Sequence, residues 1–307
     1  MEFEVTILGS NSAIPAHGRN QTSQLVRVGG SFLLLDCGEG TQIQLRKFRI
    51  KFSRIDFIFI SHLHGDHFYG LMGLISSFHL VKRERLLTIF GPQGLDEIIT
   101  VQLKHSKTQL GFPLRFISTN PENEELILEE KNFRVRTFPL QHRVPCTGFL
   151  IEEKQGLRNL VKEKLQQHKL TIEAINTLRS GRDYLDADGI ILYAVSEFAH
   201  EKKQTRKYAY CSDTIYDPRL IGIIESVDLL YHEATFDDLE AERAGTTFHS
   251  TARQAAMIAK AAGAKKLLLG HYSSRYKDLS ILLEQAKEEF TETYLSEEGM
   301  TYPIVIS

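Results

Sequence analysis

The chain has 307 residues, and its 37 Lys and Arg against 39 Asp and Glu give a formal net charge of −2. This balance excludes a chain that is basic throughout, so any nucleic-acid contact must come from local patches. A hydrophobic fraction of 42% can fill a large core and excludes collagenous or disordered composition.

The sequence shows no sign of export or membrane insertion. The start, MEFEVTILGS, lacks a basic region followed by a long apolar stretch, so we expect no secretory signal. No apolar run approaches the roughly 18 residues that cross a bilayer. Cys37, Cys146 and Cys211 are odd in number and widely spaced, which favours reduced thiols. We therefore expect a soluble cytoplasmic protein.

Short apolar runs and helical patterns alternate along the chain. In the first half we expect strands at 3–8, 24–28, 32–36, 55–60, 87–90, 126–128, 133–139 and 148–151. Helices are expected at 42–47, 67–80 and 94–103. In the second half we expect strands at 207–211, 227–234 and 265–273, and helices near 218–224, 250–263 and 279–289. Ser250 is the expected N-cap of the helix that ends at Gly263. This alternation predicts a layered α/β fold with mixed sheets.

Two basic segments depart from the even charge balance. Lys154 to Arg182 contains seven Lys or Arg and two Glu between two strand-like stretches, which predicts a projecting, partly helical insertion. Leu45 to Arg54, LRKFRIKFSR, has five basic residues and no acid. Both segments are candidate contacts for phosphates.

A cluster of ligand side chains follows the expected strand at 55–60. The stretch SHLHGDH places His62, His64, Asp66 and His67 directly after that strand. Residues two apart in an extended segment point to one side, so His62 and His64 can converge on one ion, and Asp66 and His67 can face a second. Imidazoles and carboxylates suit Zn²⁺, with Mn²⁺ or Fe²⁺ as the weaker alternatives.

Four residues cannot close two tetrahedral sites, so further ligands are needed downstream. Three polar residues end apolar strands in the same way: His142 in FPLQHRVP, Asp213 in YAYCSDT and His271 in KLLLGHYS. Taken alone, each of these residues is typical of an ordinary loop. Together with the HxHxDH stretch they supply the missing ligands.

In this order, LLLDCGEG, SHLHGDH, His142, CSDT and LLLGHYS resemble the metallo-β-lactamase superfamily. YHEAT at 231–235 and FHST at 248–251 are similar to loops of the ribonuclease Z family, endonucleases that trim precursor-tRNA 3′ ends. The resemblance covers essentially the whole chain. It implies a single domain over residues 1–307 with a metallo-β-lactamase-like αββα sandwich, from which a flexible RNA-binding arm projects at about 154–182.

The resemblance also assigns the ligands. It implies that His62, His64 and His142 hold one zinc ion, that Asp66, His67 and His271 hold the other, and that Asp213 bridges them. Asp36 would orient a ligand imidazole from outside. PAHGRN at 15–20 resembles a substrate loop of the family, which makes Arg19 and Asn20 candidate substrate-binding residues, while His17 stands where lysine is usual.

Two zinc ions per chain would activate a water molecule and neutralise a phosphodiester. Asp66 is the candidate acceptor of the water's proton. His249, oriented by Glu233, is the candidate donor of a proton to the leaving ribose 3′ oxygen. The products would be a tRNA with a 3′-hydroxyl and a trailer with a 5′-phosphate.

Other functions compete with this interpretation. Another phosphodiesterase of the same fold or a thioester hydrolase would share the metal ligands, although FHST and the basic insertion disfavour it. A β-lactamase would carry cysteine in place of Asp213, and an oxygen-reducing di-iron protein an acid in place of His64. A non-catalytic RNA-binding module is a further alternative. The resemblance also implies a homodimer that acts on precursor tRNA.

Overall fold

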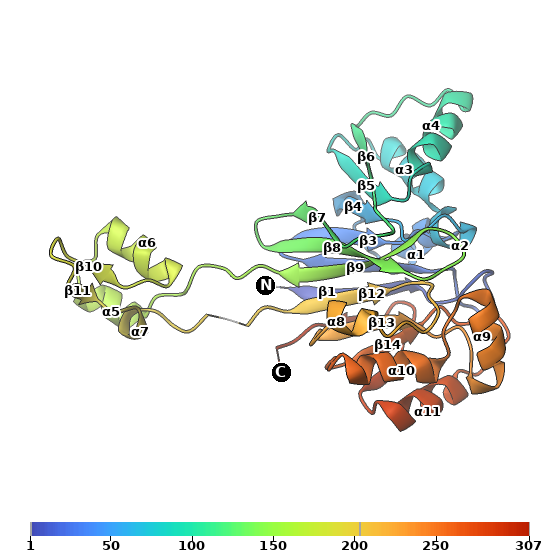
Figure 1. The fold of residues 1–307 in the computed structure, drawn as a ribbon. Coiled ribbons are helices and arrows are strands. Elements are labelled where there is room, and N and C mark those ends of the chain that lie inside the picture. The colour runs from blue at the N-terminus through green and yellow to red at the C-terminus, as the bar shows by residue number, and fades with distance from the viewer. Residues whose placement is uncertain (1, 203, 307) are drawn as a thin grey trace. The chain divides into compact units, whose positions relative to one another are not determined.

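The computed structural model describes residues 2–202 and 204–306, which form two compact units (Figure 1). The core unit contains residues 2–152 and 206–305. The second unit, residues 153–205, is called the arm below. Each unit is described separately.

The first sheet of the core unit has the strand order β16-β1-β2-β3-β4-β5-β6. Pairing is antiparallel from β16 to β3 and parallel from β3 to β6. The parallel strands end at one edge of the sheet, and the residues that follow β3 and β4 meet there. The strands are β1 (Phe3–Gly9), β2 (Ser23–Val28), β3 (Ser31–Leu35), β4 (Ile55–Phe59), β5 (Leu87–Gly91), β6 (Leu114–Ser118) and β16 (Thr301–Pro303).

The second sheet repeats this plan in the order β15-β14-β13-β12-β9-β8-β7. Strands β12 to β15 are parallel, whereas β12 pairs with β9 and β8 pairs with β7 in antiparallel fashion. The carboxyl ends of β12, β13 and β14 again deliver polar side chains to one edge. The strands are β7 (Glu125–Glu129), β8 (Phe133–Leu140), β9 (Cys146–Glu153), β12 (Lys207–Cys211), β13 (Leu229–Glu233), β14 (Leu267–Gly270) and β15 (Thr293–Leu295).

Apolar side chains hold these layers together. One buried cluster, which includes Val5, Phe59, Phe149 and Tyr210, joins the facing sides of the two sheets. A second packs α1, α3 and α4 on the first sheet, and a third packs α8, α10 and α11 on the second. This confirms the predicted αββα sandwich. The core helices are α1 (Thr41–Lys47), α2 (Gly65–Phe68), α3 (Leu71–Leu80), α4 (Leu95–His105), α8 (Leu220–Ile223), α9 (Ala241–Thr247), α10 (Ala252–Ala261) and α11 (Ser280–Glu289), with 3₁₀ turns at Phe52–Arg54 and Asp238–Glu240.

Two local expectations were wrong. The helix predicted over 67–80 is divided into α2 and α3, because the amide of Gly70 donates to the carbonyl of Cys37 at 2.9 Å and not to a helical partner. The chain is so close to the loop after β3 here that a Cβ on residue 70 would lie 2.1 Å from the carbonyl oxygen of Gly38. The N-cap of α10 is Thr251, which forms a capping box with Gln254, and Ser250 instead donates to the carbonyl of Thr214. Gly263 ends this helix as predicted, with φ of 62°.

The arm has its own small core. It contains α5 (Lys162–Gln167), α6 (Ile172–Ser180), the hairpin of β10 (Tyr184–Leu185) and β11 (Ile191–Tyr193), and α7 (Val195–Phe198). Ala174 and Leu178 of α6 are buried, and the rings of His168, Tyr193 and Phe198 pack together. The predicted insertion, 154–182, covers only the two helices. The hairpin and α7 belong to the same compact unit.

No helix in the described ranges 2–202 and 204–306 is long and apolar enough to cross a membrane.

Candidate metal centre

The loop after β4 carries four of the predicted ligand residues. His62 and His64 lie in the extended segment that leads out of β4. Asp66 and His67 occupy the first turn of α2, so the change from strand to helix turns them toward the same point. His62 and His67 are completely buried.

Four atoms form a first group, called site A: Nε2 of His62, Nδ1 of His64, Nε2 of His142 and Oδ2 of Asp213. The His64 nitrogen lies 3.1 Å from each of the other two imidazole nitrogens. The Asp213 oxygen lies 3.6 Å from the His62 nitrogen and 3.8 Å from the His142 nitrogen. Residues from the loops after β4, β8 and β12 thus converge on one point.

A second group, site B, contains Oδ2 of Asp66 and the Nε2 atoms of His67 and His271. The two imidazole nitrogens are 3.3 Å apart, and the Asp66 oxygen is 3.5 Å from each of them. Oδ1 of Asp213 completes the group, at 3.3 Å from the His67 nitrogen and 3.1 Å from the His271 nitrogen. Asp213 therefore presents one oxygen to each site.

These separations fit two tetrahedral metal ions. Nitrogen and oxygen ligands at about 2.0–2.1 Å from zinc lie about 3.3–3.4 Å from one another along the edges of a tetrahedron. The distances in site B range from 3.1 to 3.5 Å and those in site A from 3.1 to 3.8 Å. The donor set of imidazoles and carboxylates is also one that zinc accepts.

Outer partners fix the direction of most of these imidazoles. Nδ1 of His67 is 2.8 Å from Asp36 Oδ2, Nδ1 of His271 is 2.9 Å from Thr235 Oγ1, and Nδ1 of His142 is 2.9 Å from the Phe248 carbonyl oxygen. Because each Nδ1 has a partner, each Nε2 is left to point into its site. His64 is the exception, since it presents Nδ1.

Asp36 anchors this arrangement at the end of β3. Its carboxylate accepts hydrogen bonds from the Ser61 amide at 2.7 Å, the Ser61 hydroxyl at 2.8 Å and the Tyr210 hydroxyl at 2.6 Å. Tyr210 lies in β12, so its bond links the second sheet to the first. Asp36 and His271 both have left-handed backbone conformations, with φ of 52° and 59°, which are uncommon outside glycine.

The electrostatic environment of the site favours bound cations. Burial alone would lower the pKa of His67, but Asp213, Asp66 and Asp36 outweigh it and raise that pKa well above its usual value. Burial lowers the pKa of His62, so this ring stays neutral and able to bind metal. Four carboxyl groups lie in or beside the site, and bound divalent cations would offset much of their charge; they belong to Asp36, Asp66, Asp213 and Glu233.

His249 and Glu233 form a pair beside site A. Nδ1 of His249 is 2.9 Å from Glu233 Oε1, and Glu233 Oε2 accepts from the Thr235 hydroxyl at 2.6 Å. Burial alone would lower the pKa of His249, but Glu233 outweighs it and raises the pKa to about 9. The Nδ1 atom is 3.9 Å from Asp213. The His249 nitrogen that lies near Asp213 is Nδ1, which is already hydrogen-bonded to Glu233, and the raised pKa keeps the ring protonated. His249 is therefore better suited to proton transfer than to metal binding.

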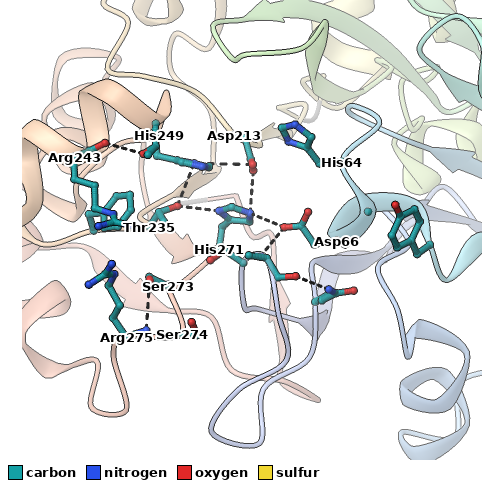
Figure 2. Close-up of a pocket in the computed structure, with 17 residues that line it drawn as sticks. His64, Asp66, Asp213, Thr235, Arg243, His249, His271, Ser273, Ser274 and Arg275 are labelled. Carbon is teal, nitrogen blue, oxygen red and sulfur yellow. Dashed lines mark hydrogen bonds and ion pairs between the residues drawn. The ribbon is translucent and has the colours of Figure 1, made fainter.

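A cavity of about 590 Å³ opens onto both sites (Figure 2). Asp66, His249 and His271 line it together with two cations that the sequence analysis missed, Arg243 and Arg275. Arg275 lies two residues after the LGHYS stretch, and this closeness to His271 was the signal that could have identified it. Arg243 lies in α9, where no motif distinguishes it.

Arg19 and Asn20 are placed differently. The Arg19 guanidinium donates to Asn11 Oδ1 at 3.0 Å and to the carbonyl oxygens of Tyr276 and Lys277. The Asn20 amide donates to Glu298 Oε2 at 2.8 Å. Neither residue is among those lining the cavity. Both connect neighbouring loops, and substrate binding by them stays a prediction.

Known proteins share this whole architecture. A protein named ribonuclease Z from Bacteroides fragilis is 43% identical over 299 residues, which span 97% of this chain and 98% of that protein. One of the same name from Cytophaga hutchinsonii is 46% identical over 302 residues, covering 98% of this chain and 96% of that protein. The chain belongs to the ribonuclease Z family.

Structural comparison agrees with this assignment. The crystal structure of the short form of human tRNase Z has a TM-score of 0.71 at 30% identity and matches 99% of this chain and 100% of its own. YhfI from Bacillus subtilis, a metallo-β-lactamase fold protein, has a TM-score of 0.70 at 21% identity and shares the fold, covering 99% of this chain and 100% of its own. The family model for the anti-Pycsar protein Apyc1 matches residues 3–158, whereas the ribonuclease Z relatives match both halves of the chain.

Proposed function

We propose that this member of the ribonuclease Z family is a zinc-dependent endoribonuclease that removes the 3′ trailer from precursor tRNA. The observation that carries the proposal is the placement of the His249–Glu233 pair beside two complete sets of metal-binding atoms, in a cavity open to substrate. A structural metal site requires no such proton donor. The family relatives support RNA as the substrate.

His62, His64 and His142 would hold one zinc ion, and Asp66, His67 and His271 the other, with Asp213 shared between them. Two bound zinc ions would supply Lewis acidity toward the scissile phosphate and an activated water as nucleophile. Arg243 and Arg275 line the same cavity and suit the phosphates that flank the cleaved bond.

The chain's own residues would handle the protons. Glu233 keeps a proton on Nδ1 of His249, and the raised pKa of this ring keeps it charged near neutral pH. Its Nε2 atom would then give a proton to the leaving ribose 3′ oxygen, a contribution of about 10²–10⁴ in rate. The Asp66 carboxylate lines the cavity and is the proposed acceptor of the proton that the attacking water releases.

The arm would bind the tRNA body. Its first part, 154–182, has five more Lys and Arg than acids, while 183–205 adds five acidic residues and two lysines. The basic charge is therefore concentrated on the segment of α5 and α6, which suits contact with phosphates of an A-form stem.

We propose that the protein is a homodimer, which the family resemblance implies. We also propose a cytoplasmic location, which the sequence analysis favours. Light scattering of purified protein would test the dimer, and a monomer mass would contradict it.

The direct test is incubation of the zinc-loaded protein with a 3′-extended precursor tRNA, followed by mapping of the cut. We expect one cut that leaves a 3′-hydroxyl on the tRNA and a 5′-phosphate on the trailer. Parallel assays with a nitrophenyl phosphodiester and a thioester separate this activity from the other hydrolases of the fold. Turnover of a small ester without any cleavage of precursor tRNA would contradict the proposal.

A further inference from the structure

The basic run 45–54 begins in the last turn of α1, and its part that lies between α1 and β4, residues 48–54, contributes to the lining of a second pocket of about 400 Å³. The pocket contains four cations and no Asp or Glu among its lining residues: Arg27, Arg49, Lys51 and Arg54. None of the metal-binding residues or cavity residues described above lines it. It is thus separate from the metal centre.

Local structure fixes the shape of this pocket. After α1 ends, Arg49 adopts a left-handed conformation with φ of 56°, and the amide of Ile50 donates to the Leu45 carbonyl at 2.9 Å. The chain then makes a 3₁₀ turn at Phe52–Arg54 before β4 begins. These constraints make the basic run an ordered loop.

Two aromatic rings form part of the wall. The Arg54 guanidinium lies over the ring of Phe32, 4.4 Å from its centre, which holds the charge in place. Phe48 packs against Gly299, where a Cβ would lie 2.5 Å from the ring. The charges above this wall are therefore positioned by packing.

Three of the four pocket cations differ in their ion pairing from other basic residues of the core unit. Arg253 forms ion pairs with Asp238, Glu288 and Glu289, and Arg83 pairs with Asp56. Within the pocket, Arg27 pairs with Glu2 and Glu4.

Arg49, Lys51 and Arg54 form no salt bridge with any residue in the described ranges 2–202 and 204–306. Three like charges that gather in one concave site repel one another, so a polyanion bound there would relieve the repulsion.

We propose that Arg49, Lys51 and Arg54 bind phosphates of the precursor RNA at a second contact site, which rests on the proposed function. Arg54 directly precedes β4, and His62 lies three residues beyond the other end of this strand. Five residues of strand span about 17 Å, so the phosphates bound here are not the scissile one. They belong either to the tRNA body or to the trailer.

The test uses the triple variant R49Q/K51Q/R54Q in the full zinc-loaded protein. A matched control, K82Q/K104Q/K107Q, removes three exposed lysines from the ends of α3 and α4 and changes the net charge equally. A double variant, R49Q/K51Q, leaves the packing of Arg54 on Phe32 intact in case the triple variant is unstable. The measured quantity is kcat/KM for precursor tRNA across salt concentrations.

We expect the triple variant to flatten the log–log salt dependence by about 2–3, at about 0.7–0.9 per lost phosphate contact. The loss of kcat/KM relative to wild type should then shrink about 20- to 40-fold between about 50 and 200 mM salt. Hydrolysis of a nitrophenyl phosphodiester should be unchanged. The double variant should show about two thirds of the change in slope, and the control variant almost none.

Substrates with a long trailer and with a single trailer nucleotide separate the two sources of phosphate. If the trailer is bound, the effect disappears with the short substrate; if the body is bound, it persists. Equal salt slopes for the triple and control variants, or an equal loss on the small phosphodiester, would overturn the inference. Wild-type protein that fails to cleave precursor tRNA would instead contradict the proposed function.

Discussion

At the metal centre almost every polar side chain is buried and held by another residue, whereas the arm leaves most of its charges in solvent. His62, His67 and Asp36 have no exposed surface. In the described part of the arm, full burial is limited to small apolar patches such as Ala174, Leu178 and Phe198. Cleavage of one phosphodiester bond requires fixed geometry. Binding of many RNAs by their phosphates requires only accessible charge.

The largest effect should come from the residue that joins the two sites. Asp213→Asn should lose metal from both sites and should reduce cleavage of precursor tRNA and of a small phosphodiester by at least about 10³-fold, because Lewis acid catalysis contributes several kcal/mol. Elemental analysis measures the metal. Asp217→Asn is the control, because Asp217 is a buried carboxylate that pairs with Arg219 and belongs to neither site. Full metal content in the Asp213 variant would contradict the proposal that Asp213 bridges the two sites.

Next in size is the loss of the proposed proton donor. His249→Ala should retain both metal ions and should cleave precursor tRNA about 10²–10⁴-fold more slowly. A nitrophenyl phosphodiester should be affected far less, because its leaving group needs no proton. Comparison of the two rates measures this difference. If both substrates slow equally, His249 has a role other than proton donation.

Removal of the arm should affect binding alone. Replacement of residues 154–204 by a short Gly/Ser linker should raise KM for precursor tRNA by about tenfold or more at physiological salt, since several phosphate contacts are lost. Its salt dependence should become flatter, and hydrolysis of the small phosphodiester should hardly change. Undiminished cleavage of precursor tRNA would show that the arm does not bind the substrate.

A smaller effect should separate two tyrosines of β12. Tyr210 donates to Asp36, while Tyr208 donates to Gln24, and both rings are fully buried. Each Tyr→Phe change should cost about 1 kcal/mol of stability through the lost hydrogen bond. Only Tyr210→Phe should weaken metal binding, by less than about tenfold, because Asp36 orients His67. Chelator competition measures the affinity, and equal values for the two variants would exclude this role.

The sequence pattern predicted a layered α/β fold, and the family resemblance implied its αββα arrangement. The pattern also indicated the strand ends that meet at the site, because each proposed ligand follows an apolar run. The strand patterns at 55–60 and 207–211 placed His62 and Asp213 at such ends, and parallel pairing brings them together. Short strands such as β6 and β15 were missed, because three to five half-exposed residues carry little periodicity.

Contacts between residues far apart in the chain could not be predicted from the sequence pattern. The engagement of Arg19 with Tyr276 and Lys277 depends on how two loops approach, and nothing near residue 19 encodes it. Thr235 supports both Glu233 and His271, yet in sequence it is only the end of a motif. The arm's extent was also missed, because the acidic hairpin after Arg182 has a different composition from the basic helices before it.

The left-handed backbone conformations of Asp36 and His271 lower stability at two residues that the proposed activity requires. Such conformations cost of order 1–3 kcal/mol for residues other than glycine, and the surrounding structure must sustain them. Glycine at either position would relax the backbone while deleting a carboxylate that orients a ligand or a ligand itself. A mutant library selected for resistance to heat in the presence of a chelator should therefore accumulate glycine or asparagine at 271 among its stabilised, inactive members. Position 36 should keep its carboxylate, because Ser61 and Tyr210 donate hydrogen bonds to it. This fold accepts local instability at the positions where its chemistry takes place.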